Sequence, residues 1–123
     1  MSTITQAREL LATALSAVPG YTVSPRPSKR PSVRPGDGWI TMGQITPTDF
    51  AHCNVTLTAT VAFGTDLFLA EERAEDDAML LLEAVNSAPL YFHSIVMSPG
   101  IMTSEEGQGI YTFSIELQSE VDQ

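Results

Sequence analysis

The sequence predicts one α+β domain in which a mostly antiparallel sheet carries two helices on one face. Apolar residues recur at helical spacing in two separate segments, and elsewhere they alternate with polar residues as in half-buried strands. The expected elements follow the order α-β-β-β-α-β-β, and such separate helical and hairpin-like runs favour helices packed on one side of a sheet. The length fits a single domain that spans residues 1–123.

The first helix is expected near the N-terminus, in the segment "TITQARELLATALSAVPG". Thr3 and Gln6 have the spacing of a capping box, in which each side chain accepts a hydrogen bond from the other residue's backbone N–H. Pro19 and Gly20 end the helix, and residues 21–24 are a candidate for a short strand. The apolar stripe of the helix consists of Ile4, Ala7, Leu11, Ala14, Leu15 and Val18.

Two strands are expected in the middle of the chain. Residues 39–46 form the first, and Gly43 within it indicates a β-bulge. Residues 54–64 form the clearest strand, which we expect at the centre of the sheet. Its alternation of apolar and threonine side chains indicates a sheet with one covered face and one wetter face, which is typical of antiparallel sheets. The inward residues are Val55, Leu57, Ala59, Val61 and Phe63, and the outward ones include Thr56, Thr58 and Thr60.

The second helix is expected within residues 65–89, with Thr65 or Asp66 as its N-cap and Pro89 at its end. The last two strands are expected over residues 90–97 and 110–120. The intervening segment "SPGIMTSEEGQG" shows little pattern and is expected to form a loop. The buried residues of the helix are expected to be Ala70, Ala74, Ala78, Leu81, Leu82 and Val85, and those of the last strand Tyr111, Phe113, Ile115 and Leu117.

The chain is acidic, but one short segment is strongly basic. The net charge is −9, and four of the six lysines and arginines lie in "PRPSKRPSVRPG", residues 25–36, which we call the basic arm. Its four prolines remove backbone donors and exclude a regular central strand, so an extended loop is expected. Residues 37–123 carry a net charge of −13, which argues against a general nucleic-acid binder. The four basic residues are Arg26, Lys29, Arg30 and Arg34.

The arm has three possible roles. It could keep the protein soluble, or its cations could contact nucleic-acid phosphates, although it offers no aromatic side chain for base stacking. It could also dock onto an acidic protein surface. We favour the third role, because an arm of charge +4 complements the acidic body of other copies of the same chain.

No set of residues predicts catalysis, a cofactor or a nucleophile. His52 and Cys53 are neighbours in an extended segment, so their side chains point to opposite faces and cannot work together. His93 is expected on the surface of a strand, without a second histidine nearby. We therefore expect a protein that is not an enzyme. There is no run of about 18 apolar residues that would span a membrane, and no export signal is expected at the N-terminus.

Acidic residues cluster in the second helix, and two interpretations apply to them. Glu72, Glu75 and Asp76 share a helix face, as metal ligands do, but no phosphate-binding glycine loop precedes them. We therefore favour a solvated or partner-facing acidic surface over a metal site. The candidates for this surface are Glu71, Glu72, Glu75 and Asp76, with Asp77 next to them.

The layout resembles that of a known family. An "ARELLATAL" helix runs into "GYTVSPRPSKRPSVRPGDGWITMG", and "VTLTATVAFGTDLFLAEERAEDDAMLLLEAV" and "GIYTFSIELQSEV" follow. This resembles the neck and tail-completion proteins of long-tailed bacteriophages of actinobacteria, and most of all the tail terminators. Head–tail connector (head-closure) proteins of the same neck are the alternative within this class, and a non-viral protein-binding module is the alternative outside it.

The resemblance implies a structural virion protein that acts mechanically. It implies a homo-hexameric ring that caps the head-proximal end of the tail tube, stops tube polymerisation and joins the tail to the head connector. The implied partners are other copies of the chain, the tail tube protein and the head–tail connector protein. Phage DNA would pass through the lumen without sequence-specific binding. The implied location is the virion neck, after assembly in the host cytoplasm, and no catalytic residue carries over.

Overall fold

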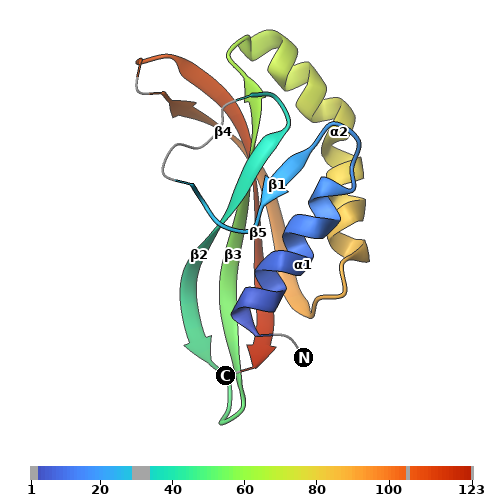
Figure 1. Cartoon of the computed structure of the whole chain (residues 1–123), viewed down its shortest axis with the longest axis vertical. Helices are drawn as coiled ribbons and strands as arrows, with labels where there is room; N and C mark the ends of the chain where they lie inside the picture. Colours follow the sequence, from blue (N-terminus) through green and yellow to red (C-terminus); the bar gives the residue numbers. More distant parts are fainter. Residues whose placement is uncertain (1–2, 29–33, 105, 123) are drawn as a thin grey trace.

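The computed structural model describes residues 3–28, 34–104 and 106–122, and it confirms an α+β fold with the expected order of elements. Figure 1 shows these elements along the chain. They are α1 (Ile4–Ser16), β1 (Thr22–Ser24), β2 (Asp37–Pro47), β3 (His52–Gly64), α2 (Leu67–Ser87), β4 (Phe92–Thr103) and β5 (Gly109–Asp122).

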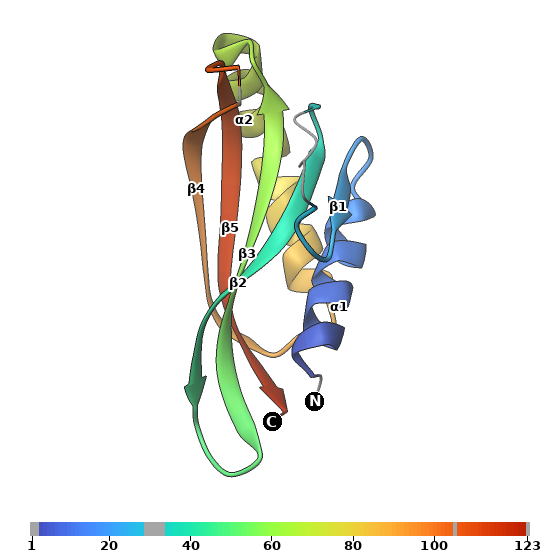
Figure 2. The same ribbon diagram turned by 60° about the vertical axis from the view of Figure 1, so that its left-hand side comes forward.

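The strands form one sheet in the order β1-β2-β3-β5-β4. Three of the four pairings are antiparallel, and β1 pairs with β2 in parallel. Figure 2 shows both helices on the same side of the sheet. The strand expected at the centre, β3, does lie there, between β2 and β5.

The core lies between the helices and the covered face of the sheet. Along β3, buried and half-buried residues alternate from His52 to Val61, which confirms the predicted inward face. In the register of β3 with β5, Leu57 lies opposite Leu117 and Ala59 opposite Ile115, so the buried rows of the two strands are adjacent. The helices add the fully buried side chains of Leu11, Leu15, Leu81 and Val85 to this core.

Both helix starts follow the predicted chemistry. At α1, the capping box is present: the Gln6 N–H donates to Thr3 Oγ1 and the Thr3 N–H donates to Gln6 Oε1. At α2, Asp66 is the cap, and its Oδ1 accepts from the Leu69 N–H. The predicted buried stripes were wrong for Ala14, Ala78 and Leu82, which are half-buried because they lie at the border of the faces that the helices turn to the core. Ile4 of α1 and Phe113 of β5 are also only half-buried, but both pack against the core.

The prediction for the segment after residue 97 was wrong. It was expected to be a loop up to residue 109, but β4 continues to Thr103. Pro99 lies within this strand, opposite Phe113 of β5. A proline is tolerated there because β4 is an edge strand, so the missing N–H does not interrupt a ladder between two neighbours. Pairing with β5 therefore overrides the local turn signals.

The strand β2 is irregular where Gly43 predicted a bulge. Its register with β3 shifts between Met42 and Ile45, which confirms that prediction. Beyond the bulge, β2 and β3 continue as a hairpin whose turn projects from the end of the molecule (Figures 1 and 2). The parallel partner β1 ends opposite Trp39, so it leaves the distal half of β2 without a neighbour on that side among the described residues.

Candidate assembly surfaces

The first residue of the basic arm, Pro25, is bound to the domain by a buried arginine of α1. Arg8 of α1 is only 7% exposed, and its Nε donates to the Pro25 carbonyl oxygen at 2.8 Å. Its Nη2 donates to the Ile40 carbonyl oxygen of β2 at 2.7 Å. Burial, together with the charge of Arg26, lowers the pKa of the Arg8 guanidinium. The sequence pattern did not predict that Arg8 is buried. Its acceptors come from distant parts of the chain, so nothing in the neighbouring sequence indicates them.

The arm returns to the domain at a tightly packed glycine. The Gly36 N–H donates to the Ala62 carbonyl oxygen at 2.8 Å, and its own carbonyl accepts from the Thr22 N–H at 2.9 Å. Gly36 has a φ of +92°, and a Cβ at this position would lie 2.1 Å from the Gly20 carbonyl oxygen. The two ends of the arm are therefore fixed on the body of the domain.

The arm's basic residues are only partly placed. Arg26 and Arg34 are exposed, one near each end of the arm, whereas Lys29 and Arg30 lie outside the described residues. Arg34 lines a hollow of about 480 Å³ together with Leu69 and Arg73 of α2. The returning end of the arm thus lies beside the first turns of α2. No ion pair within residues 3–28, 34–104 and 106–122 joins Arg26 to the acidic cluster of that helix.

The acidic cluster of α2 faces outward, as expected. Glu71, Glu72, Glu75 and Asp76 are all exposed. Three of them, with Phe68, line a shallow hollow of about 280 Å³. Exposed apolar side chains lie at either end of the cluster, Phe68 on one side and Met79 and Leu80 on the other. Within the described part of the chain, no group of three or more His, Cys, Asp or Glu side chains is arranged to hold a metal ion.

Asp77 differs from the other acids of the helix because it is part of the packing. Its carboxylate accepts a hydrogen bond from the Tyr21 hydroxyl and lies 3.7 Å from Arg73 Nε. The Arg73 guanidinium also lies over the Tyr21 ring, 5.2 Å from its centroid. Burial, and then the bond to Asp77, raises the pKa of Tyr21 above its ordinary range. Asp77 therefore joins α2 to the segment before β1 and does not extend the acidic surface.

The face of the sheet opposite the helices is polar and acidic along β3 and β5, whereas the neighbouring β4 adds the exposed Val96 opposite Glu116. Thr58 of β3 lies opposite Glu116 of β5, and Asn54 lies opposite Glu120. None of the strands β2 to β5 contains a lysine or an arginine. Neither helix covers this face, which carries Thr56, Thr58 and Thr60 of β3 and Ser114, Glu116, Gln118 and Glu120 of β5.

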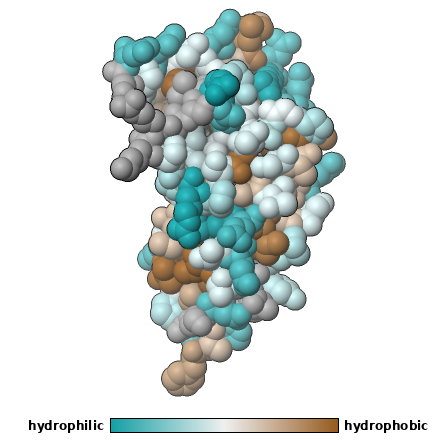
Figure 3. Space-filling model, in the orientation of Figure 1, coloured by the Kyte–Doolittle hydropathy of each residue, from teal (hydrophilic) through white to brown (hydrophobic). Residues whose placement is uncertain are grey.

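Several large apolar side chains are exposed at places that the sequence pattern did not indicate. Phe50, at the β2–β3 turn, is fully exposed, and Met42 and Ile45 on β2 are almost half exposed. Figure 3 shows a brown patch on the left-hand side of the molecule and a pale brown tip at its lower end. The exposed position of Phe50 could have been predicted from the sequence, because this aromatic residue lies inside the turn segment "PTDFAH". On the edge strand β4, Val96 and Ile101 are also exposed.

The histidines and the cysteine take separate positions. Cys53 is buried in the core, whereas His52 lies on the other face of β3 and contacts Asp49, which confirms that the two side chains diverge. His93 lies on the surface, as predicted, with its Nε2 3.3 Å from Glu120 Oε2.

Comparison with known proteins adds no relative. No protein-family model matches the chain, and no curated protein matches it. Among the described residues, neither helix is both long and apolar enough to cross a bilayer. The fold and these surfaces thus define an α+β domain with one uncovered polar sheet face, a basic arm and an outward acidic helix.

Proposed function

We propose that this chain is a ring-forming tail terminator of a long-tailed bacteriophage. In this role it caps the head-proximal end of the tail tube, stops tube polymerisation and joins the tail to the head connector. The observation that carries the assignment is the uncovered polar face of β3 and β5, which has acids but no lysine or arginine. The layout of the sequence, which resembles that of tail terminators, supports the same role.

An uncovered polar sheet face suits the wall of a DNA channel. Threonine and serine side chains stay hydrated there, and they need no protein partner. The carboxylates of Glu116, Glu120 and Asp122 repel DNA phosphates, and the strands β3 and β5 contain no lysine or arginine that would bind the phosphates. In the proposed ring this face lines the lumen, and DNA slides past it without sequence-specific binding.

Two strand edges that no described residue pairs with suit closure of a ring. The sheet ends at β4 on one side, and on the other side β1 covers only the first part of β2. Unpaired edges of this length are usually covered in a finished assembly, because they otherwise promote aggregation. Two different edges meeting in a head-to-tail contact generate a closed ring when the rotation per subunit closes. Six copies form the ring in our proposal.

The basic arm is proposed to join neighbouring subunits. Arg26, Lys29, Arg30 and Arg34 would reach the acidic surface of the next copy, formed by Glu71, Glu72, Glu75 and Asp76, or an acidic surface of the tube. Its fixed ends and its prolines reduce the conformational freedom that docking has to remove. The other proposed partners are the tail tube protein and the head–tail connector protein, and the proposed location is the virion neck.

The test combines mass in solution with tube assembly. Native mass spectrometry or sedimentation should give a particle of six 13.3 kDa subunits. Added to polymerising tail tube protein, the chain should shorten the tubes and appear by electron microscopy as a ring at one end. Binding to connector rings but not to tube ends would assign the chain to the head-closure proteins instead. A monomer that binds neither would contradict the proposed function and favour a non-viral binding module.

A further inference from the structure

The β2–β3 turn is an ordered structure with an aromatic side chain at its tip. The backbone N–H groups of Thr48 and Asp49 both point to the His52 carbonyl oxygen, at 3.1 and 3.4 Å. Asp49 Oδ1 accepts from the N–H groups of Ala51, at 2.8 Å, and His52, at 2.9 Å. Phe50 lies between these contacts and is fully exposed. The position of Phe50 therefore depends on the residues that hold the turn.

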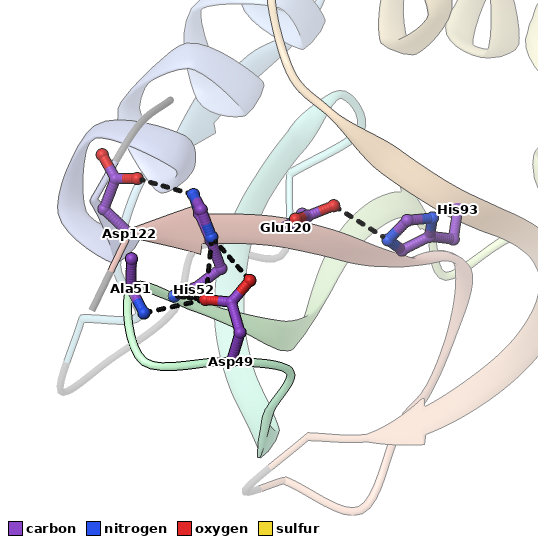
Figure 4. A network of polar contacts seen from close by, with 6 residues as sticks. All are labelled: Asp49, Ala51, His52, His93, Glu120 and Asp122. Carbon is purple, nitrogen blue, oxygen red and sulfur yellow. Dashed lines mark hydrogen bonds and ion pairs between the residues drawn. The ribbon is translucent and has the colours of Figure 1, made fainter.

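The His52 imidazole lies between the turn and the end of β5. Its Nδ1 is 2.9 and 3.0 Å from the two carboxylate oxygens of Asp49. Its Nε2 is 3.8 Å from Asp122 Oδ1, and His52 and Asp122 are direct partners in the β3–β5 register. Figure 4 shows the ring with one carboxylate on each side.

We propose that His52 is a proton-dependent latch, which when protonated bridges Asp49 and Asp122 and thereby fixes the turn that presents Phe50. A protonated imidazole has two N–H groups and a positive charge, so it attracts both carboxylates at once. A neutral imidazole has one N–H and no charge. It can keep the hydrogen bond to Asp49, but the attraction to Asp122 is then lost, and only the backbone pairing of β3 with β5 still connects the turn to β5.

The charges around the ring favour the protonated form. Among residues 3–28, 34–104 and 106–122, the charged groups that face it are Asp49 from the turn and Glu120 and Asp122 from β5, while His93 of β4 contacts Glu120 from the other side. The hydrogen bond to Asp49 is the main cause that raises the pKa of His52, and the same bond lowers the pKa of Asp49. The latch is therefore complete below the pKa of an unfolded histidine, about 6.5. It opens as the pH rises through the higher pKa of the folded state.

The consequence concerns any protein surface that receives Phe50. A turn held in one position loses less conformational entropy on docking than a loose one, so contacts through Phe50 should weaken as the pH rises. This pH dependence goes beyond the tail-terminator role, because it follows from the turn itself.

Amide hydrogen exchange of the whole protein tests the latch. Protection factors for residues 48–53, corrected for the intrinsic effect of pH on exchange, should be compared between about pH 5 and pH 9, on both sides of the histidine pKa. Wild-type protection should fall by up to about fivefold as the pH rises, the range for loss of one exposed ion pair. The variant His52→Gln should show, at every pH, the low protection that the wild type has at high pH. The matched control His93→Gln removes the other histidine and should keep the wild-type profile.

Histidine NMR titration in the same samples completes the test. The step in protection should coincide with the titration of the His52 ring, and Asp122→Asn should lower the pKa of that ring and flatten the step. Flat wild-type protection across a pH range in which His52 titrates would overturn the latch, as would a step that persists in His52→Gln. These measurements need neither a ring nor tail tube protein, so their failure is distinguishable from failure of the proposed function.

Discussion

The basic arm and the β2–β3 turn both leave the body of the domain, but they are held in different ways. The arm is attached through the buried guanidinium of Arg8 and the packed backbone of Gly36. The turn is held by the partly exposed side chains of Asp49 and His52. Polar contacts are stronger in the protein interior than between exposed charges in water. The attachment of the arm should therefore be strong and insensitive to pH near neutrality, and that of the turn weak and pH-dependent.

The largest effect is expected from reversing the charge of the arm. Changing Arg26, Lys29, Arg30 and Arg34 together to Glu takes the arm from +4 to −4. Like charges facing each other at an interface cost several kcal/mol, so ring formation and tail-to-head joining in a complementation assay should fall sharply. The circular dichroism spectrum and the stability of the monomer should barely change. The same four residues changed to Gln are the matched control and should give an intermediate loss, and wild-type assembly of the Glu variant would leave the arm a solubilising loop.

The next largest effect is expected on the free energy of unfolding, from a substitution at the point where the arm returns to the domain. Gly36→Ala places a Cβ 2.1 Å from the Gly20 carbonyl oxygen at a φ of +92°. Strain at such a position and the enforced backbone shift should together lower the free energy of unfolding by about 3 kcal/mol. Gly107→Ala is the control, because φ is +80° but, apart from the adjoining residues, no atom of the described part of the chain lies within 4 Å of the added Cβ. Its loss in urea unfolding should be about 1–2 kcal/mol. Equal losses in the two variants would mean that the contact with Gly20 does not hold the arm.

A smaller loss is expected where the arm leaves the domain. Arg8→Met keeps most of the apolar stem but removes the donors to the Pro25 and Ile40 carbonyl oxygens. Leaving buried acceptors without a donor should lower the free energy of unfolding by about 2 kcal/mol. Arg26→Met changes an exposed residue of the same type and should stay within about 0.5 kcal/mol of wild type. If the urea concentration at the midpoint of unfolding is the same for Arg8→Met as for the wild type, the arm is not attached through this side chain.

The smallest effect should come from the turn, through the pH dependence of stability. The folded state holds the His52 proton more tightly than the unfolded chain does, because the pKa of His52 is raised. Deprotonation therefore destabilises the folded state, and this contribution is lost as the pH rises above about 6.5 and through the folded pKa. Urea unfolding at a series of pH values should show the decline in wild type and a reduced one in His52→Gln. A rise in stability over this range that depends on His52 would contradict the sign.

Much of the fold followed from local patterns in the sequence. The alternation in β3 identified its buried and polar faces, because side chains of a strand point to its two sides in turn. The caps at Thr3 and Asp66 were predictable, because a capping side chain bonds to an N–H only three residues away. The outward position of the acidic residues followed from helical spacing. In each case the partners lie within one turn or one strand.

The features that the sequence did not predict depend on distant contacts. β4 continues through Pro99 because β5 pairs with it, and this partner lies 14 positions further along the chain. Arg8 is buried because its acceptors belong to residues 17 and 32 positions away. Asp77 packs against the domain and is not part of the acidic surface, because the hydroxyl of Tyr21, 56 positions away, donates a hydrogen bond to its carboxylate. The ring contacts of His52 also depend on how β5 ends beside the turn.

The sequence by itself determined the α+β class, the order of the elements, the polar and apolar faces of β3, and the separation of a basic arm from an acidic body. These properties depend on side-chain periodicity and on charge, which are local. Only the tertiary structure decided that Arg8 and Gly36 hold the arm, that the polar face of the sheet stays uncovered by the helices, and that Phe50 projects from a turn braced by His52. The physical reason is that burial and hydrogen bonding are properties of residues brought together by folding, and the chain sequence does not state which distant residues will meet.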